Sequence, residues 1–274
     1  MGAGQLPKSV PARLGGTMKN KRQNEILKLL MVEQDLKTEY LATHFGVSIE
    51  TIRRDLKELE QAGLIKKVYG GVSLVTDTIH MTMLEKWNVR VENRHTEKVK
   101  LATRALDLIE DHSVIALDIG TTTYELSRLL STKKGLSIIT NSLPIASELA
   151  RNTPHKIYCI GGMVIADEIV TSGVFARNFL NNFASINMFI GSADGLTLKS
   201  GITEFNEAVV DIKQQLIARA DRNVALVDHS KFGKEALFVS CAPKDLDVLV
   251  TDAQAPAKDL EMFQKLGVEV IVVP

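Results

Sequence analysis

Three short stretches near the start of the chain repeat apolar residues at the spacing of an α-helix. The first has an apolar side made by Ile26, Leu27, Leu29 and Leu30. The second covers residues 38–45, and Gly46 then turns the chain into the third, which Ser48 can cap through its hydroxyl. The third carries one narrow apolar stripe, made by Ile52, Leu56 and Leu59. The order helix, glycine-containing turn, helix predicts a helix-turn-helix in which the second helix reads DNA.

A short basic ribbon follows the third helix. Gly63 ends the helix and the chain turns again at Gly70 and Gly71, which predicts the wing of a winged helix-turn-helix. On DNA, phosphate contacts would supply affinity and arginine forks would read guanine edges. The predicted contacts with double-stranded operator DNA are Thr38, Ser48, Glu50, Thr51, Arg53, Arg54, Lys57, Lys66, Lys67 and Tyr69.

The charged face of the third helix has a plain structural alternative. Charged outer faces are normal on surface helices, and Arg54 and Lys57 could simply pair with Glu50 and Glu58. Taken alone, the helix fits both interpretations equally well. The upstream helix and turn are what favour DNA binding.

The pattern changes after residue 110. Short runs rich in β-branched residues alternate there with amphipathic helical stretches. The runs span residues 114–120, 136–141, 156–162, 186–195, 223–230, 247–252 and 268–273. Near-continuous apolar strands that alternate with helices predict an α/β fold with a mainly parallel, Rossmann-like sheet covered on both faces.

These patterns divide the chain into four segments. Residues 1–17 read as the remnant of an expression tag in front of Met18. We expect a winged helix-turn-helix domain over 18–74, a partly helical linker over 75–95 and an effector-sensing domain over 96–274. The length of 274 residues is comfortable for two domains.

Polar residues stand where the predicted strands end. Ligands bind outside the carboxyl ends of parallel strands, so these residues predict a ligand site. After the first strand, Gly120 allows a close turn and three threonines open the next helix, which suits an anion such as phosphate. The predicted effector contacts are Asp118, Gly120, Thr121, Thr122, Thr123, Asn141, Ser142, Gly161, Gly162, Asp194, Gly195, Glu207, Asp228 and Lys231.

Each strand end also has a structural alternative. Thr121 could only cap its helix, and Asn141 could likewise serve a cap. Gly161 and Gly162 could be only a turn, and Lys231 could pair with a carboxylate instead of a ligand phosphate. The convergence of these polar ends on one edge of the sheet is what favours a site.

Composition narrows the classes of function. Lysine and arginine together number 33, as do aspartate and glutamate, so the net charge is zero. Basic residues gather locally from Arg53 to Lys67, with Lys19, Lys21 and Arg22 near the start. No run approaches the ~20 apolar residues of a membrane span. Cys159 and Cys241 are isolated, which fits a reducing cytosol, and neither has metal-ligand spacing. We expect a cytoplasmic protein with no cofactor, no metal and no membrane partner.

Taken together, these motifs resemble the DeoR family of transcriptional regulators from Lys19 onward. The DNA-reading stretch VSIETIRRDLKELEQAGLIKKVYGGV is similar almost residue for residue, as are LDIGTTTYEL, ITNSLPIA, GSADG, SGIT and VDHSKFG. The resemblance implies a winged helix-turn-helix joined to a domain related to ribose-5-phosphate isomerase, in a repressor of a sugar-catabolism operon that a phosphorylated sugar releases from DNA. It also implies an anion cradle at Gly120–Thr123 and further ligand contacts at Asn141, Asp194 and Lys231.

The chain departs from the family pattern after Gly161 and Gly162. Many relatives carry a basic residue within a few positions, whereas this chain continues MVIADEIV, apolar and then acidic. The difference leaves open an unphosphorylated or otherwise substituted sugar as the effector.

Three functions fit these observations. The first is a homodimeric or homotetrameric repressor, because helix-turn-helix readers usually pair on repeated half-sites. The second is an isomerase-like enzyme with an accessory DNA module, for which acid–base chemistry would be available from Asp118, Asp194, Glu207, Asp228 and Lys231. The third is an architectural DNA binder without a ligand. No nucleophile elbow, Walker loop or GxGxxG fingerprint occurs, so we expect a sensor without catalytic residues.

Overall fold

A computed structural model of the chain describes residues 21–32, 35–68, 71–75 and 83–274. The chain divides into two compact units, Met1–Val89 and Arg90–Pro274. The predicted tag remnant, Tyr69 and Gly70 of the predicted wing and residues 76–82 of the predicted linker lie outside the described residues.

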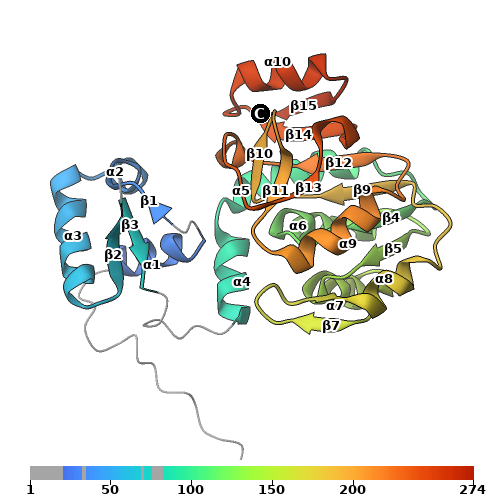
Figure 1. Cartoon of the computed structure of the whole chain (residues 1–274), viewed down its shortest axis with the longest axis horizontal. Coiled ribbons are helices and arrows are strands. Elements are labelled where there is room, and N and C mark those ends of the chain that lie inside the picture. Colours follow the sequence, from blue (N-terminus) through green and yellow to red (C-terminus); the bar gives the residue numbers. More distant parts are fainter. Residues whose placement is uncertain (1–20, 33–34, 69–70, 76–82) are drawn as a thin grey trace, which may run out of the picture. The chain divides into compact units, whose positions relative to one another are not determined.

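The described part of the first unit begins with three helices and a small antiparallel sheet (Figure 1). The helices are α1 (Lys21–Val32), α2 (Thr38–Phe45) and α3 (Ile49–Gln61), and the strands, in sheet order, are β1 (Asp35–Leu36), β3 (Gly71–Leu74) and β2 (Ile65–Val68). Each helix contributes buried apolar residues to one core, among them Ile26, Leu41 and Ile52. The predicted helix-turn-helix with a wing is therefore confirmed.

Local chemistry explains where these elements begin and turn. The Ser48 hydroxyl accepts a hydrogen bond from the Thr51 amide at 3.2 Å, which caps α3 as predicted. Gly46 ends α2 in the left-handed region, with a φ of 60°. A β-carbon at Gly71 would lie 2.3 Å from the Leu36 carbonyl oxygen, so only glycine lets β3 approach β1 this closely.

One further helix, α4 (Met83–Glu92), lies within the segment predicted as a partly helical linker. The division between the two units falls inside it, between Val89 and Arg90.

The described part of the second unit is built on a seven-stranded sheet in which every adjacent pair is parallel. In sheet order the strands are β15 (Glu269–Val273), β14 (Val248–Asp252), β12 (Asn223–Leu226), β9 (Met188–Gly191), β4 (Val114–Leu117), β5 (Ser137–Thr140) and β6 (Lys156–Cys159). The order can be followed in Figure 1 from β15 through β9 and β4 to β5. All seven predicted strand runs belong to this sheet, and the predicted α/β class is confirmed.

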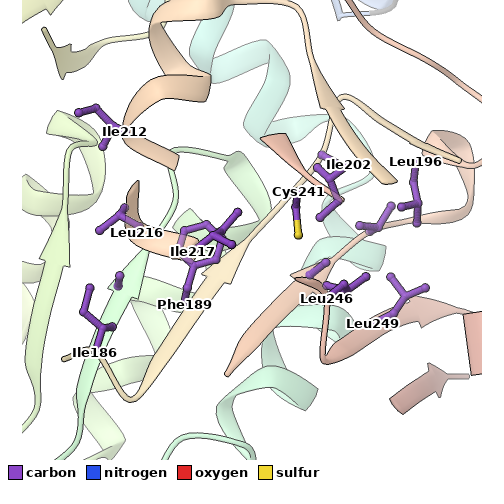
Figure 2. Packing of buried hydrophobic residues seen from close by; sticks show 14 of the residues in the cluster. Ile186, Phe189, Leu196, Ile202, Ile212, Leu216, Ile217, Cys241, Leu246 and Leu249 are labelled. Atoms are coloured by element: carbon purple, nitrogen blue, oxygen red, sulfur yellow. The ribbon is translucent and has the colours of Figure 1, made fainter. Parts of the chain in front are cut away.

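Helices cover both faces of the sheet and create two cores. One core contains apolar residues of α5 (His95–Leu106), α6 (Thr121–Leu129) and α7 (Leu143–Asn152). The other contains residues of α8 (Val174–Leu180), α9 (Glu207–Ile217) and α10 (Ala257–Lys265). Figure 2 shows Leu216 and Ile217 of α9 beside Phe189 of β9. Successive strand residues alternate between the cores, as Ile115 and Ala116 do, because strand side chains alternate between faces.

Two small antiparallel sheets are absent from the sequence prediction. One consists of β10 (Gly195–Thr197), β11 (Gly201–Glu204) and β13 (Phe238–Cys241), and the other is the hairpin of β7 (Met163–Ile165) and β8 (Val170–Ser172). These strands have three or four residues each and, apart from Gly195, lie outside the seven apolar runs from which strands were predicted. Short 3₁₀ turns occupy Leu130–Thr132, His229–Lys231 and Pro243–Asp245.

Within the residues that the structure describes, no helix is long and apolar enough to cross a membrane. Nor do three or more histidine, cysteine, aspartate or glutamate side chains gather there in a way that could hold a metal ion.

Candidate functional site

Helix α3 divides its side chains between a buried and an exposed face. Ile52 and Leu59 are buried in the core of the first unit. The exposed face carries the predicted DNA contacts Glu50, Arg53, Arg54 and Lys57, whereas Thr51 is half-buried. A helix held by one face and charged on the other can enter a major groove without rearranging its core.

Three cations of this surface are paired with carboxylates of α3. Arg53 lies 3.0 Å from Glu50, and the Arg54 Nε atom lies 3.6 Å from the Glu58 carboxylate. Lys67 of the wing lies 2.7 Å from Glu60. The structural alternative is therefore realised in part. Exposed pairs of this kind contribute only about 0–1 kcal/mol, so DNA phosphates can displace the carboxylates.

A groove of about 690 Å³ runs between α3 and the wing. Its lining brings together four of the predicted DNA contacts, namely Thr38, Arg53, Lys57 and Lys67. Its floor is apolar and includes Leu56 and Val72. The groove places three cations from α3 and β2 around one channel, an arrangement that suits a DNA backbone.

Asp55 anchors the reader helix, and the sequence analysis missed it. It is 4% exposed, and the Arg22 Nε atom of α1 donates to its carboxylate at 2.5 Å. Gln23 donates to Glu58 at 2.8 Å beside this pair. The signal was available, because Asp55 lies next to Leu56 and Leu59 on the buried side of α3.

The carboxyl ends of β4 and β9 mark the topological switch point of the large sheet. From β4 the chain proceeds to β5 and β6 on one side and then returns to β9 on the other. Ligands of open parallel sheets bind in the crevice at this point. Asp118 follows β4, and the loop that starts at Ser192 follows β9.

The turn after β4 requires glycine. A β-carbon on Gly120 would lie 1.8 Å from the Ser192 hydroxyl oxygen, so a larger residue would displace the Ser192 side chain in the neighbouring loop. Gly120 precedes α6 and makes no side-chain cap for its first-turn amides. The Thr123 hydroxyl donates to the Asp118 and Gly120 carbonyl oxygens at 2.8 and 2.7 Å. Thr123 therefore holds the loop, while Thr121 is half-buried and Thr122 is 6% exposed.

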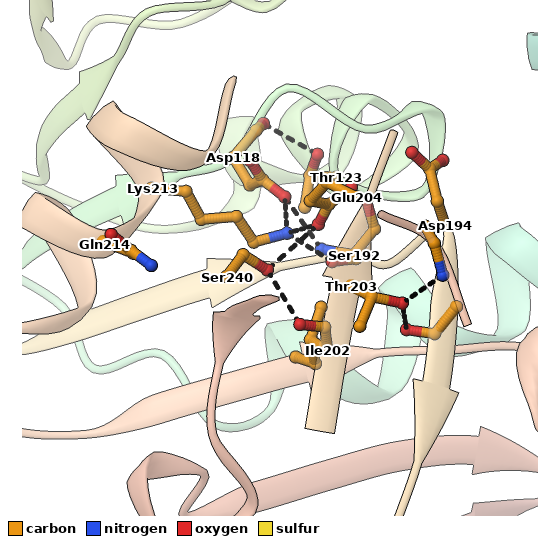
Figure 3. A network of polar contacts seen from close by, with 12 residues as sticks. Asp118, Thr123, Ser192, Asp194, Ile202, Thr203, Glu204, Lys213, Gln214 and Ser240 are labelled. Atoms are coloured by element: carbon orange, nitrogen blue, oxygen red, sulfur yellow. Dashed lines mark hydrogen bonds and ion pairs between the residues drawn. The ribbon is translucent and has the colours of Figure 1, made fainter. Parts of the chain in front are cut away.

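A buried lysine that the sequence analysis did not identify lies beneath this loop (Figure 3). Lys213 of α9 is 1% exposed at its side chain and donates to Asp118 at 2.9 Å, to the Ser192 carbonyl at 2.6 Å and to Glu204. Asp118 also accepts from the Ser192 amide at 3.1 Å. Asp118 is thus part of the scaffold that joins β4, β9 and α9.

Charges in this cluster affect one another strongly. Burial disfavours the Lys213 ammonium, but Asp118 and Glu204 outweigh burial and raise the pKa of Lys213. Burial raises the pKa of Glu204, and the negative charges of Asp194 and Asp118 raise it further. Lys213 opposes both effects. The cluster therefore keeps Lys213 charged.

A second missed lysine stands beside the carboxyl end of β12. Lys98 of α5 is 7% exposed and donates to the Arg90 carbonyl oxygen rather than to a carboxylate. Its pKa is lowered to about 8, mainly by burial; the charges of Asp228 and Glu125 oppose this lowering, and those of Lys231 and Arg90 add to it. The Lys98 ammonium is thus influenced by charges of both signs, from the strand end of β12 and from α6.

The same strand end holds an arginine and a histidine. Arg94, which adopts a left-handed backbone conformation with a φ of 52°, places Nη1 3.0 Å from the Nε2 atom of His229. The Nδ1 atom of His229 lies 2.9 Å from Asp252. Burial would raise the pKa of Asp228, but hydrogen bonds from Ser230 and the charges of Lys231 and Arg94 lower it overall.

Several predicted contacts have structural roles. Asn141 donates to the Thr171 carbonyl at 3.0 Å, and Ser142 caps α7 by accepting from the Ile145 amide at 3.4 Å. Gly162 lies where a β-carbon would be 2.6 Å from the Ser172 carbonyl oxygen, whereas Gly161 faces open space. These positions match the cap and turn alternatives.

Three other predicted contacts lie around α9 and β10. Asp194 accepts from the Phe205 amide at 3.1 Å, and Figure 3 shows its carboxylate turned away from Lys213. A β-carbon on Gly195 would lie 2.4 Å from the Lys234 carbonyl oxygen. Glu207 is exposed in the first turn of α9.

The hairpin of β7 and β8 carries the segment that departs from the family pattern. Its Glu168 pairs with Arg90 at 3.0 Å, and Ile169 has a φ of 56°, which is strained for a β-branched residue. The hairpin is tied to the strand end of β5, since the Leu143 amide donates to the Ile169 carbonyl at 3.1 Å.

Comparison with known proteins matches both units. A family model described as the DeoR-like helix-turn-helix domain matches residues 22–78, and one described as the DeoR C terminal sensor domain matches residues 93–253. The chain is 32% identical to the HTH-type transcriptional regulator GolR of Listeria innocua over 91% of this chain and 96% of that protein. It is 32% identical to the transcriptional repressor AccR of Agrobacterium fabrum over 85% of this chain and 89% of that protein.

A third relative is the glycerol-3-phosphate regulon repressor of Escherichia coli, 29% identical over 88% of this chain and 94% of that protein. Among solved structures, a D-ribose-5-phosphate isomerase is similar with a TM-score of 0.39 and 20% identity, over 49% of this chain and 52% of that one. That last similarity is too low to bear on the site.

Proposed function

The chain belongs to the DeoR family of transcriptional regulators, and from this premise we propose that it is a repressor of a sugar-catabolism operon whose sensor unit binds a sugar phosphate. Membership makes it a DNA-binding regulator. Repression as opposed to activation, the identity of the effector, and the residues that contact DNA and effector belong to the proposal.

Buried Lys98 carries the proposal. Its ammonium donates to a backbone carbonyl, and the charges of Asp228 and Lys231 both act on it. A phosphate bound beside Lys98 and Lys231 would be attracted by both cations and would accept from the first-turn amides of α6. Lys98 therefore joins the predicted contacts Gly120, Thr121 and Lys231 in the proposed phosphate subsite, and Asp194 would accept from sugar hydroxyls.

The names of relatives support a phosphorylated carbohydrate. One is a glycerol-3-phosphate regulon repressor, and another, 28% identical, is a putative aga operon transcriptional repressor of Escherichia coli. For this chain the effector must bind the DNA-incompetent arrangement more tightly than the competent one, since equal affinity would shift nothing.

Two of the carboxylates that isomerisation would use are engaged within the protein. Asp118 is held by Lys213 and Ser192, and Asp228 accepts from the Ser230 amide at 2.9 Å. The named relatives are regulators, and we extend the proposal to a regulator without catalytic activity, which acts in the cytoplasm as a homodimer or homotetramer on repeated half-sites.

Thermal unfolding and calorimetry on the full chain test the effector. A panel of pentose and hexose phosphates is compared with the unphosphorylated sugars and with inorganic phosphate, because a true ligand stabilises the fold by mass action. We expect stabilisation by at least one phosphorylated sugar, and a loss of about tenfold or more in its affinity in Lys231→Ala. Equal affinity for the parent sugar would instead favour the unphosphorylated alternative, and product formation would favour the enzyme.

A further inference from the structure

The first turn of α3 exposes an apolar side chain that the core does not use. Ile49 is the first helical residue and is 38% exposed, whereas Ile52 and Leu56 of the same helix are 0% and 6% exposed. One exposed isoleucine is ordinary on a protein surface. Its place is what matters, because the N-terminal residues of a reader helix are the ones that reach base edges.

Two charged residues complete the same turn. The side chains of Glu50 and Arg53 are 76% and 63% exposed and form an ion pair at 3.0 Å. The pair is weak because it is exposed, so both groups can exchange partners on DNA. Ile49, Glu50 and Arg53 thus present a methyl-rich surface, an acceptor and a donor fork side by side.

Each of these groups complements one feature of the major groove. Apolar side chains contact the thymine C5-methyl group, carboxylates accept from cytosine N4, and arginine donates to guanine O6 and N7. One helical turn rises ~5.4 Å and base pairs are spaced at about 3.4 Å, so one turn extends over about two base-pair steps, and its side chains contact neighbouring pairs of one half-site.

We propose that Ile49 is a specificity-determining residue that reads a thymine methyl group, and that Glu50 and Arg53 read a cytosine and a guanine within the same half-site. The assignment rests on the DNA-reading role of α3 and does not depend on the effector. Lys67 differs from these residues because it lies on β2 of the wing and not on the reader helix, so a phosphate contact is expected there. Arg53 lines the same groove from α3.

The test begins with selection of binding sequences from a random duplex library by the full chain. Each thymine of the selected half-site is then replaced by deoxyuridine, which lacks only the methyl group. We expect one replacement to weaken wild-type binding about fourfold, which corresponds to about 0.8 kcal/mol for one buried methyl group. Ile49→Ala should bind the thymine duplex about as weakly and show no further loss with deoxyuridine, while Ile49→Val retains part of the sensitivity.

Lys67→Ala is the matched control. It should weaken binding to all sequences alike and reduce the salt dependence, with the thymine preference intact. Glu50→Gln and Arg53→Lys should relax selection at the cytosine and guanine. A deoxyuridine penalty that is equal in wild type and Ile49→Ala would overturn the assignment, as would a selected half-site without thymine. Unchanged unfolding midpoints in all variants show that the first unit is folded. If the full chain selects no sequence at all from the library, the DNA-reading role of α3 itself is overturned.

Discussion

Lys98 lies on the buried side of α5, in line with Leu101, Ala102 and Ala105. A lysine at such a position loses hydration, and its pKa falls to about 8. Asp118 is as deeply buried but is fully engaged by Lys213 and the Ser192 amide. The contrast separates a residue that supports the sheet edge from the buried lysine that we propose as a phosphate contact.

The lowered pKa of Lys98 makes stability depend on pH. The pKa of Lys98 is about 10.5 in the unfolded chain and about 8 in the folded chain. Burying the charged form therefore costs stability fully below pH 8, and this cost fades as the pH rises from about 8 to about 10.5. Relative to Lys98→Met, the wild type should gain about 2 kcal/mol of unfolding free energy between pH 7 and about pH 9.5. Urea unfolding of both proteins at the two pH values measures this difference. A difference that is independent of pH would contradict the burial argument.

At the scale of elements, the reader helix depends on its N-terminus. Ser48 caps α3 through the Thr51 amide, and Asp55 fixes the middle of the helix to Arg22 of α1. Helix α6 has no side-chain cap in its first turn, since Gly120 precedes it. A side chain therefore caps α3 but not α6, and the first-turn amides of α6 are the ones that we propose for the ligand.

Ser48→Ala should lower the stability of the first unit by about 1 kcal/mol, because the cap hydrogen bond is lost. Ser48→Asp restores a capping oxygen and should recover this stability, yet it should weaken DNA binding because a carboxylate repels phosphates. Asn206→Ala removes the equivalent cap of α9, where Asn206 accepts from the Ala208 amide at 3.0 Å, and serves as the control in the second unit. Hydrogen exchange of each helix reports the local effect. Equal protection of α3 in Ser48→Ala and wild type would show that the cap is dispensable.

At the scale of the whole molecule, DNA reading and effector sensing occupy different units. Sequence similarity covers both units in the relatives, which indicates that the two are used together. Regulation then requires that the two sites share one conformational equilibrium.

The double variant Arg53→Ala/Arg54→Ala should lose operator binding by at least about tenfold and keep effector affinity, since its changes lie in the first unit alone. Lys231→Ala should show the reverse, with DNA bound but not released by the effector. Electrophoretic shift with and without the sugar phosphate, together with calorimetry, measures both properties. Wild-type operator affinity in the double variant would refute the reader assignment.

The sequence by itself determined the elements and the class of function. The apolar stripe of α3, its Ser48 cap and the strand runs of the parallel sheet are local patterns, because they depend on residues within one turn or one strand. They sufficed for the winged helix-turn-helix, the seven-stranded sheet and the resemblance to a regulator family.

Only the tertiary structure decided what each polar residue does. Lys213 reaches Asp118 across 95 residues of sequence, and the charges of Asp228 and Lys231 act on Lys98 from a distant part of the chain. Such partners are set by the order of strands in the sheet, which no local spacing encodes. Asn141, Ser142 and Thr123 accordingly form hydrogen bonds with the backbone around them, while Lys98, an ordinary helix residue in the sequence, is buried beside the carboxylate of Asp228.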